Sequence, residues 1–97
     1  MKILALEHEL PGATAEQFQH YANKESQKVW ELDQMDVIRE LYFRADQHEA
    51  VLVLECQLVD ETQEALAVLP FVRAGLISFD MIPLKAYPGF ERLFVKS

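Results

Sequence analysis

The feature that most constrains this chain is the order in which short apolar runs alternate with a helical pattern. An apolar run from Ile3 to Leu6 leads into the turn signal LPGA and is typical of a strand. Thr14 and Gln17 then have the spacing of a capping box, which marks the start of a helix. Behind this box, one helical face carries a stripe in which a single acid interrupts apolar residues. The stripe consists of Phe18, Ala22, Glu25, Val29 and Leu32.

Two more strands, a short helix and a last strand complete the predicted order. The segments VIRELYFR and AVLVLECQLV flank a polar turn and predict a β-hairpin. A helix follows from about Asp60 to Pro70, which ends it, and the last strand runs from Leu76 to Leu84. The order strand, helix, strand, strand, helix, strand predicts an α+β domain of the ferredoxin-like βαββαβ type. We therefore expect an antiparallel four-stranded sheet with two helices on one face.

Length and charge limit both the number of domains and the kinds of partner. The 97 residues, 51% of them hydrophobic, predict a single domain over residues 1–97. The net charge is −7, from 9 Lys and Arg against 16 Asp and Glu, and argues against nucleic acid or an anionic membrane as a partner. The first apolar run is too short for a signal peptide or a membrane span, so we expect a cytoplasmic protein. The single cysteine, Cys56, excludes an internal disulfide.

Two helices on one face would leave the other face of the sheet open. Because side chains alternate along a strand, each strand contributes one set to each face. We assign to the open face a mixture of apolar and charged side chains, which favours a homodimer whose sheets enclose a cavity. The expected set is Ile3, Glu7, Glu40, Tyr42, Arg44, Val51, Val53, Glu55, Leu76, Ser78, Asp80 and Ile82.

The C-terminal segment LPFVRAGLISFDMIPLKAYP, which begins at Leu69, resembles that of muconolactone isomerase-like proteins. In that family a Leu-Pro helix end leads to a last strand and a tail that contains proline. The portion PFVRAGL is also similar to the YCII-related family. Both families belong to the dimeric α+β barrel group, so the resemblance implies that fold and a homodimer over nearly the whole chain. The motif itself covers about a fifth of the sequence.

The resemblance also singles out Glu25. Muconolactone isomerase-like chains tend to carry Glu at this point of the first helix, and YCII-related chains tend to carry a functional His. The resemblance implies a cavity between the sheet and the first helix, in which protons are transferred on a small unsaturated lactone or organic acid. The chain departs from the isomerases in the sequence ELYFR, where Tyr and Phe precede Arg44 in place of a Trp-Arg pair, and in its tail YPGFERLF.

Isomerisation of such a substrate needs a general base and a group that stabilises the enolate. A carboxylate in an apolar pocket suits the first role because desolvation raises its pKa, so we assign it to Glu25. Arg44 or Tyr42 would stabilise the developing negative charge. The alternative is a structural Glu25 that pairs with Arg39, Arg44 or Arg73.

Six further residues are predicted to bind substrate. They are Glu7, His8, Glu40, Glu55, Ser78 and Asp80. We expect no cofactor and no resident metal, although the acids in this set would also suit a divalent cation and hence a metal-dependent oxidative enzyme. A non-catalytic dimer that binds or senses a small ligand is the other alternative. His48 falls in the hairpin turn and is expected to be a surface residue.

The tail GFERLFVKS carries three large apolar residues at three- and four-residue spacing: Phe90, Leu93 and Phe94. A helical turn this short is not stable alone. We therefore expect residues 88–97 to dock on the body of the protein or on a partner subunit, or to close the cavity as a lid.

Overall fold

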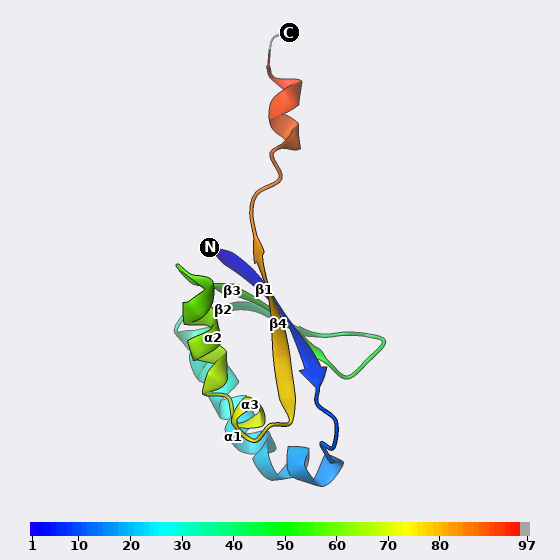
Figure 1. Cartoon of the computed structure of the whole chain (residues 1–97). Helices are drawn as coiled ribbons and strands as arrows, with labels where there is room; N and C mark the ends of the chain where they lie inside the picture. Colours follow the sequence, from blue (N-terminus) through cyan, green and yellow to red (C-terminus); the bar gives the residue numbers. More distant parts are fainter. Residues whose placement is uncertain (96–97) are drawn as a thin grey trace.

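The computed structural model describes residues 1–95, and it has the predicted α+β architecture. The sheet consists of four antiparallel strands in the order β2-β3-β1-β4, and the helices cover one of its faces (Figure 1). The strands are β1 (Lys2–Glu9), β2 (Ile38–Phe43), β3 (Ala50–Glu55) and β4 (Ile77–Leu84), and the helices are α1 (Ala15–Gln34), α2 (Val59–Ala67), α3 (Pro70–Arg73) and the 3-10 turn η1 (Gly89–Leu93).

Helix α1 begins and ends as its sequence predicts. The Thr14 side chain accepts a hydrogen bond from the Gln17 backbone N–H, and the Gln17 side chain accepts one from the Thr14 backbone N–H, so the capping box is confirmed. At the other end Val37 N–H donates to Leu32 O, which is the closing bond of a Schellman motif. Asp36 occupies the left-handed position of this motif with a φ of 61°.

The second helical segment differs from the prediction in one respect. Pro70 does not end the segment. It occupies the first turn of a further short helix, α3, where a missing N–H costs nothing. Gly75 follows with a φ of 74°, and the bond from Leu76 N–H to Phe71 O closes this turn. The turn leads the chain directly from α3 into β4.

The core lies between the sheet and the helices, and it corrects the predicted faces of β1. Ala5 pairs with Leu52 of β3 and Met81 of β4, so these three side chains share the helix-covered face. Ile3 and Glu7 lie on the same face as Ala5, since they are two residues away on either side. The prediction that Ile3 and Glu7 belong to the open face is therefore wrong.

The open face, as the strand register defines it, consists of Lys2, Leu4, Leu6, His8, Glu40, Tyr42, Val51, Val53, Glu55, Ser78, Asp80, Ile82 and Leu84. Leu76 is also absent from this face, because it precedes β4 and is buried at 2% exposure. Arg44 follows the end of β2 and bonds across the hairpin to Glu49. The apolar members of this face are Leu4, Leu6, Val51, Val53, Ile82 and Leu84, of which only Val51, Val53 and Ile82 were predicted.

Residues 85–95, here called the arm, leave the end of β4 and project away from the body (Figure 1). The molecule measures 62 × 29 × 20 Å and its radius of gyration is 16.3 Å, whereas a compact chain of this length would have about 12.5 Å. The apolar side chains of the arm are between 67% and 83% exposed: Tyr87, Phe90, Leu93, Phe94 and Val95. The last two residues of the predicted docking tail lie outside the described residues.

None of the helices within residues 1–95 is long and apolar enough to cross a membrane.

Candidate functional site

A pocket lies between α1 and the sheet, where the resemblance implies a cavity. It has a volume of about 620 Å³, which is within the range of small-molecule sites. The end of β1, the first turns of α1, the β2–β3 loop and α3 all contribute to it. Its lining residues, which define the Glu7 pocket, are Glu7, Glu9, Ala15, Phe18, Gln19, Ala22, Phe43, Gln47, His48, Glu49 and Phe71.

Glu25 lies next to this pocket but is not part of its lining. It is only 9% exposed, one helical turn beyond Ala22. Its carboxylate accepts a hydrogen bond of 2.9 Å from the Phe71 backbone N–H. The alternative in which Glu25 pairs with an arginine is not observed, because within residues 1–95 no Lys or Arg forms an ion pair with it.

The surroundings of Glu25 favour its neutral form. Burial raises the pKa of Glu25 and is the largest influence. The N–H of Phe71 opposes this by lowering the pKa, and the negative charge of Glu7 adds to the rise. Glu25 is therefore a buried acid with a raised pKa, and its assignment as the general base remains a prediction.

Glu7 is a second acid with a raised pKa, and it does line the pocket. Burial is again the main cause, and the neighbouring charges of Glu49 and Glu9 contribute to it. The Ala50 backbone N–H and His48 act in the opposite direction and lower the pKa. The structure thus contains two acids with raised pKa values, Glu7 at the pocket lining and Glu25 next to it.

Apart from His48, the ionisable side chains that line the Glu7 pocket are all acidic. Three carboxylates line it, those of Glu7, Glu9 and Glu49, whereas no Lys or Arg is among its lining residues. Its other hydrogen-bonding groups are Gln19, Gln47 and His48, and its apolar part is mainly aromatic. Phe18 and Phe71 meet edge to face at 5.0 Å, and His48 stacks on Phe43 at 4.6 Å. Such a pocket favours an uncharged ligand and repels an anion.

Arg44 and Tyr42 lie outside this pocket. Arg44 donates to both carboxylate oxygens of Asp46, at 2.9 and 2.6 Å, and its guanidinium is 3.6 Å from Glu49. Tyr42 donates to Glu40 at 2.8 Å on the open face. Within residues 1–95 neither side chain forms a hydrogen bond or ion pair with Glu25, although Arg44 pairs with Glu49, which lines the pocket.

The other predicted substrate-binding residues lie on the open face, not beside Glu7. His8 Nε2 is 2.7 Å from Asp80 Oδ2, and Ser78 is the strand partner of His8. His8 Nδ1 is also 4.0 Å from Glu49, so His8 lies at the rim between the two faces. Glu55 bonds to the N-terminal ammonium group at 3.1 Å. The structure therefore divides the predicted set between two faces of the sheet.

Glu7 is the one predicted site residue among those that line the pocket, and the others, which include Phe18, His48, Glu49 and Phe71, were not predicted as site residues. Phe18 could have been found, because it precedes Glu25 by seven residues and so lies on the same helical face. His48, Glu49 and Phe71 reach the pocket only through the fold of the β2–β3 loop and of α3. In residues 1–95, no three His, Cys, Asp or Glu side chains converge in a way that could hold a metal ion.

Comparison with solved structures identifies the fold. Muconolactone isomerase matches with a TM-score of 0.75 over 91% of this chain and 92% of its own, at 17% sequence identity. The 5-chloro-2-hydroxyhydroquinone dehydrochlorinase of Burkholderia phenoliruptrix AC1100, solved with 2,5-dihydroxybenzoquinone, matches with a TM-score of 0.63 over 92% and 98%, at 18% identity. No known family model and no curated protein matches the sequence. The chain therefore has the muconolactone isomerase-like fold.

Proposed function

We propose that this protein is an isomerase or lyase that transfers protons on a small, uncharged, unsaturated carbonyl compound bound in the Glu7 pocket. The observation that carries the proposal is the pair of carboxyl groups, Glu7 and Glu25, whose pKa values are both raised beside one apolar pocket. The fold shared with an isomerase and a dehydrochlorinase supports an enzyme of this general kind. Within the predicted class of lactones and organic acids, the negative lining favours a neutral lactone.

The reaction needs no group beyond those at the site. One carboxylate takes a proton from the carbon beside the carbonyl, and the electron pair of that C–H bond moves into an enolate. The resulting carboxylic acid returns the proton to the far end of the conjugated system, so the double bond moves and no atom is gained or lost. Glu7 lines the pocket and is the group that meets the substrate, while Glu25, buried next to the pocket, accepts a hydrogen bond from the Phe71 backbone N–H. Gln19 and His48 are the donors available to the enolate oxygen.

In this proposal Arg44 takes a supporting role. Its guanidinium is 3.6 Å from Glu49 and holds that side chain at the pocket wall. Arg44 and Tyr42 were predicted to stabilise the enolate, but both lie outside the pocket. We therefore assign that role to the hydrogen-bond donors that line the pocket.

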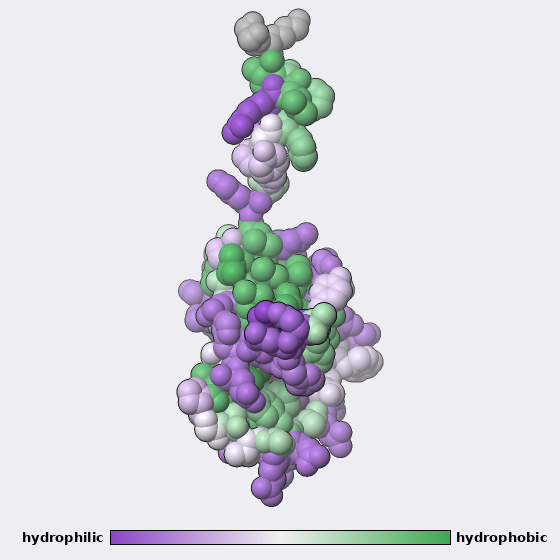
Figure 2. Space-filling view, turned by 90° about the vertical axis from the view of Figure 1, so that its right-hand side faces the viewer, coloured by the Kyte–Doolittle hydropathy of each residue, from purple (hydrophilic) through white to green (hydrophobic). Residues whose placement is uncertain are grey.

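We infer further that the active form is a homodimer. The open face carries an apolar stripe that includes Leu4, Leu6 and Val53, and Ile82 on it is 41% exposed. Figure 2 shows hydrophobic surface over the upper part of the body and again along the arm. Two sheets packed face to face would cover the stripe, and the arm of each subunit would then lie against its partner.

Incubation with α-angelica lactone, a neutral butenolide with a β,γ double bond, tests the catalytic proposal. Conversion to the conjugated isomer is followed by ultraviolet absorption, and proton exchange at carbon by NMR in D₂O. Glu7→Gln and Glu25→Gln should each lower the rate, by about 10²–10⁴-fold for the acid–base residue that acts directly. An analogue that carries an added carboxylate should react more slowly than the neutral lactone.

Glu64→Gln is the matched control, because Glu64 is an exposed acid of α2 outside the Glu7 pocket. Equal rates in all three variants and in the unchanged protein would contradict proton transfer by these groups. Saturable binding of the lactone without exchange or conversion would instead favour the non-catalytic ligand-binding alternative.

A further inference from the structure

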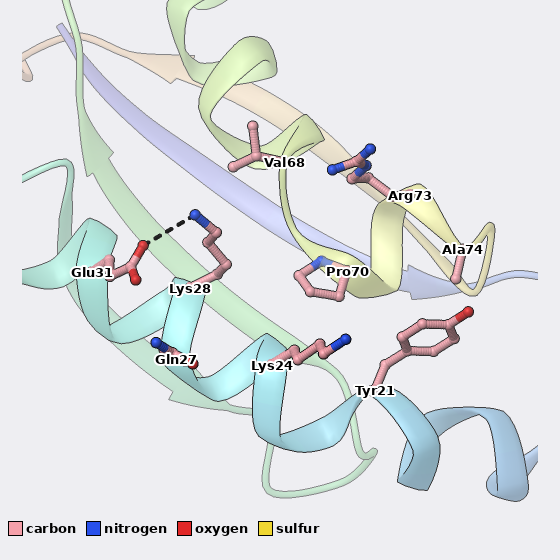
Figure 3. A pocket seen from close by; sticks show the side chains of 9 residues that line it. All are labelled: Tyr21, Lys24, Gln27, Lys28, Glu31, Val68, Pro70, Arg73 and Ala74. Carbon is pink, nitrogen blue, oxygen red and sulfur yellow. Dashed lines mark hydrogen bonds and ion pairs between the residues drawn. The ribbon is translucent and has the colours of Figure 1, made fainter.

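A second pocket lies on the other side of α1, between that helix and the α2–α3 connection (Figure 3). Its volume is about 560 Å³, and it shares no lining residue with the Glu7 pocket. We call it the Lys24 groove. Its lining residues are Tyr21, Lys24, Gln27, Lys28 and Glu31 of α1, with Val68, Pro70, Arg73 and Ala74 on the opposite wall.

The charge of this groove is opposite to that of the whole chain. Three of the 9 basic residues line it, Lys24, Lys28 and Arg73, although the net charge of the protein is −7. The only acid in the lining is Glu31. The lining therefore carries a local charge of +2, from three cations and one anion. The Glu7 pocket, in contrast, is lined by three acids and by no Lys or Arg.

The positive charges of the groove are only partly neutralised by the protein itself. Glu31 pairs with Lys28 at 3.2 Å, whereas neither Lys24 nor Arg73 has an acid within ion-pair distance in the described part of the chain. Lys24 and Lys28 are four residues apart on α1, a spacing at which like charges repel. An anion bound next to Lys24 would offset its repulsion from Lys28, and Arg73 would add a second positive charge to the same site.

The remaining lining defines the ligand more closely. Tyr21 and Lys24 project from α1 toward α3, and Arg73 stands on the opposite wall (Figure 3). The hydroxyl of Tyr21 and the amide of Gln27 add uncharged donors. Val68, which is 44% exposed, and Pro70 supply an apolar surface. Arginine and lysine on facing walls suit a molecule with more than one carboxylate, and the apolar surface suits its carbon skeleton.

The geometry points to the Lys24 groove as a binding site for small organic polycarboxylates, separate from the Glu7 pocket. The two pockets divide ligands by charge, because the acids of the Glu7 pocket repel the anions that the groove attracts. This inference does not depend on the proposed reaction, since no residue of the groove takes part in it.

Equilibrium dialysis of the full chain with radiolabelled citrate, at neutral pH and constant ionic strength, tests the inference. Citrate should bind saturably at one site per chain, and inorganic phosphate, which has no carbon skeleton, should compete weakly. Lys24→Gln combined with Arg73→Gln should weaken citrate binding about tenfold or more, because it removes the charges of both walls. Lys24→Gln alone keeps Arg73 in place and should produce a smaller loss in the same direction.

Arg39→Gln combined with Lys85→Gln is the matched control, since it removes the same two kinds of charge outside the groove. Its citrate affinity should equal that of the unchanged protein. An equal loss in both double variants would overturn the inference in favour of general electrostatic attraction. Citrate binding that is unchanged in the groove variants but stronger in Glu7→Gln would overturn it in favour of the Glu7 pocket, and phosphate competing as well as citrate would contradict the role of the apolar wall.

Discussion

The surroundings of Glu25 disfavour its ionised form, so ionisation of Glu25 should lower the stability of the folded protein. Since the folded-state pKa of Glu25 is raised, the folded protein binds a proton more tightly than the unfolded chain does. The free energy of unfolding therefore falls as the pH rises from the pKa of Glu25 in the unfolded chain through its higher pKa in the folded protein. Glu25→Gln has no such titration, so its stability relative to the unchanged protein should increase across this window and become constant above it.

Urea unfolding between pH 4 and 8, followed by circular dichroism, measures this difference. Other acids titrate in the same range, so only the difference between variant and unchanged protein isolates Glu25. Glu64→Gln, at an exposed site of α2, is the control for the substitution itself. A Glu25→Gln curve parallel to that of the unchanged protein would contradict the raised pKa.

Asp36 provides a second prediction at the scale of one residue. Its φ of 61° belongs to the left-handed region, where a side chain is unfavourable and glycine is not. Asp36→Gly should therefore raise the free energy of unfolding by about 0.5–1 kcal/mol. Asp33→Gly, three residues earlier within α1, should lower it. Urea denaturation of the two variants compares them directly, and a loss of stability in both would show that the strain at Asp36 is negligible.

Among the elements, α1 could be predicted and the faces of β1 could not. The start of α1 depends on a local exchange of hydrogen bonds between Thr14 and Gln17, which adjacent residues specify completely. In β1, both alternating sets are apolar, so the period of two does not say which set faces the helices. The pairing of Ala5 with Leu52 and Met81 decides it, and those partners are distant in sequence.

This uncertainty about β1 also limited the prediction of the site. Glu25 was identified correctly as the acid of the helical stripe, and its burial is confirmed. Glu7 was assigned to the wrong face, so its place in the pocket beside α1 was missed. His48 and Phe71 were missed for a related reason: a loop and a single helical turn bring them to the pocket, and neither has a periodic pattern.

The face assignment of β1 can be tested with two truncations of similar size. Ile3 is 0% exposed in the core, so Ile3→Ala should cost about 2–4 kcal/mol of unfolding free energy through lost burial and the cavity left behind. Leu4 lies on the open face and is only partly buried within one subunit. Leu4→Ala should therefore cost clearly less when unfolding is measured at protein concentrations at which subunits are dissociated. A larger loss for Leu4 than for Ile3 would reverse the assignment.

At the scale of the whole molecule, a single subunit leaves two large apolar surfaces exposed to solvent. The arm carries five large apolar side chains that are at least 67% exposed, and the sheet presents an apolar stripe on its open face. Exposed apolar surface of this kind usually marks a protein interface. The symmetric dimer that we propose would cover both features in each subunit, because the same patch is presented twice in an isologous interface.

Sedimentation equilibrium of the full chain tests this arrangement. The unchanged protein should have twice the 11.2 kDa mass of one subunit, or a larger multiple of it. Phe90→Ser combined with Phe94→Ser should weaken the assembly by about a hundredfold or more, because burying one Phe side chain stabilises by about 1.5–3 kcal/mol and each 1.4 kcal/mol is tenfold in affinity. Glu91→Gln combined with Arg92→Gln changes the polar side chains of the same turn and should leave the assembly intact.

Since the arm projects from the body, the circular dichroism of both double variants should match that of the unchanged subunit. A chain that remains monomeric at all concentrations, or an assembly unaffected by the loss of both phenylalanines, would contradict a role for the arm between subunits.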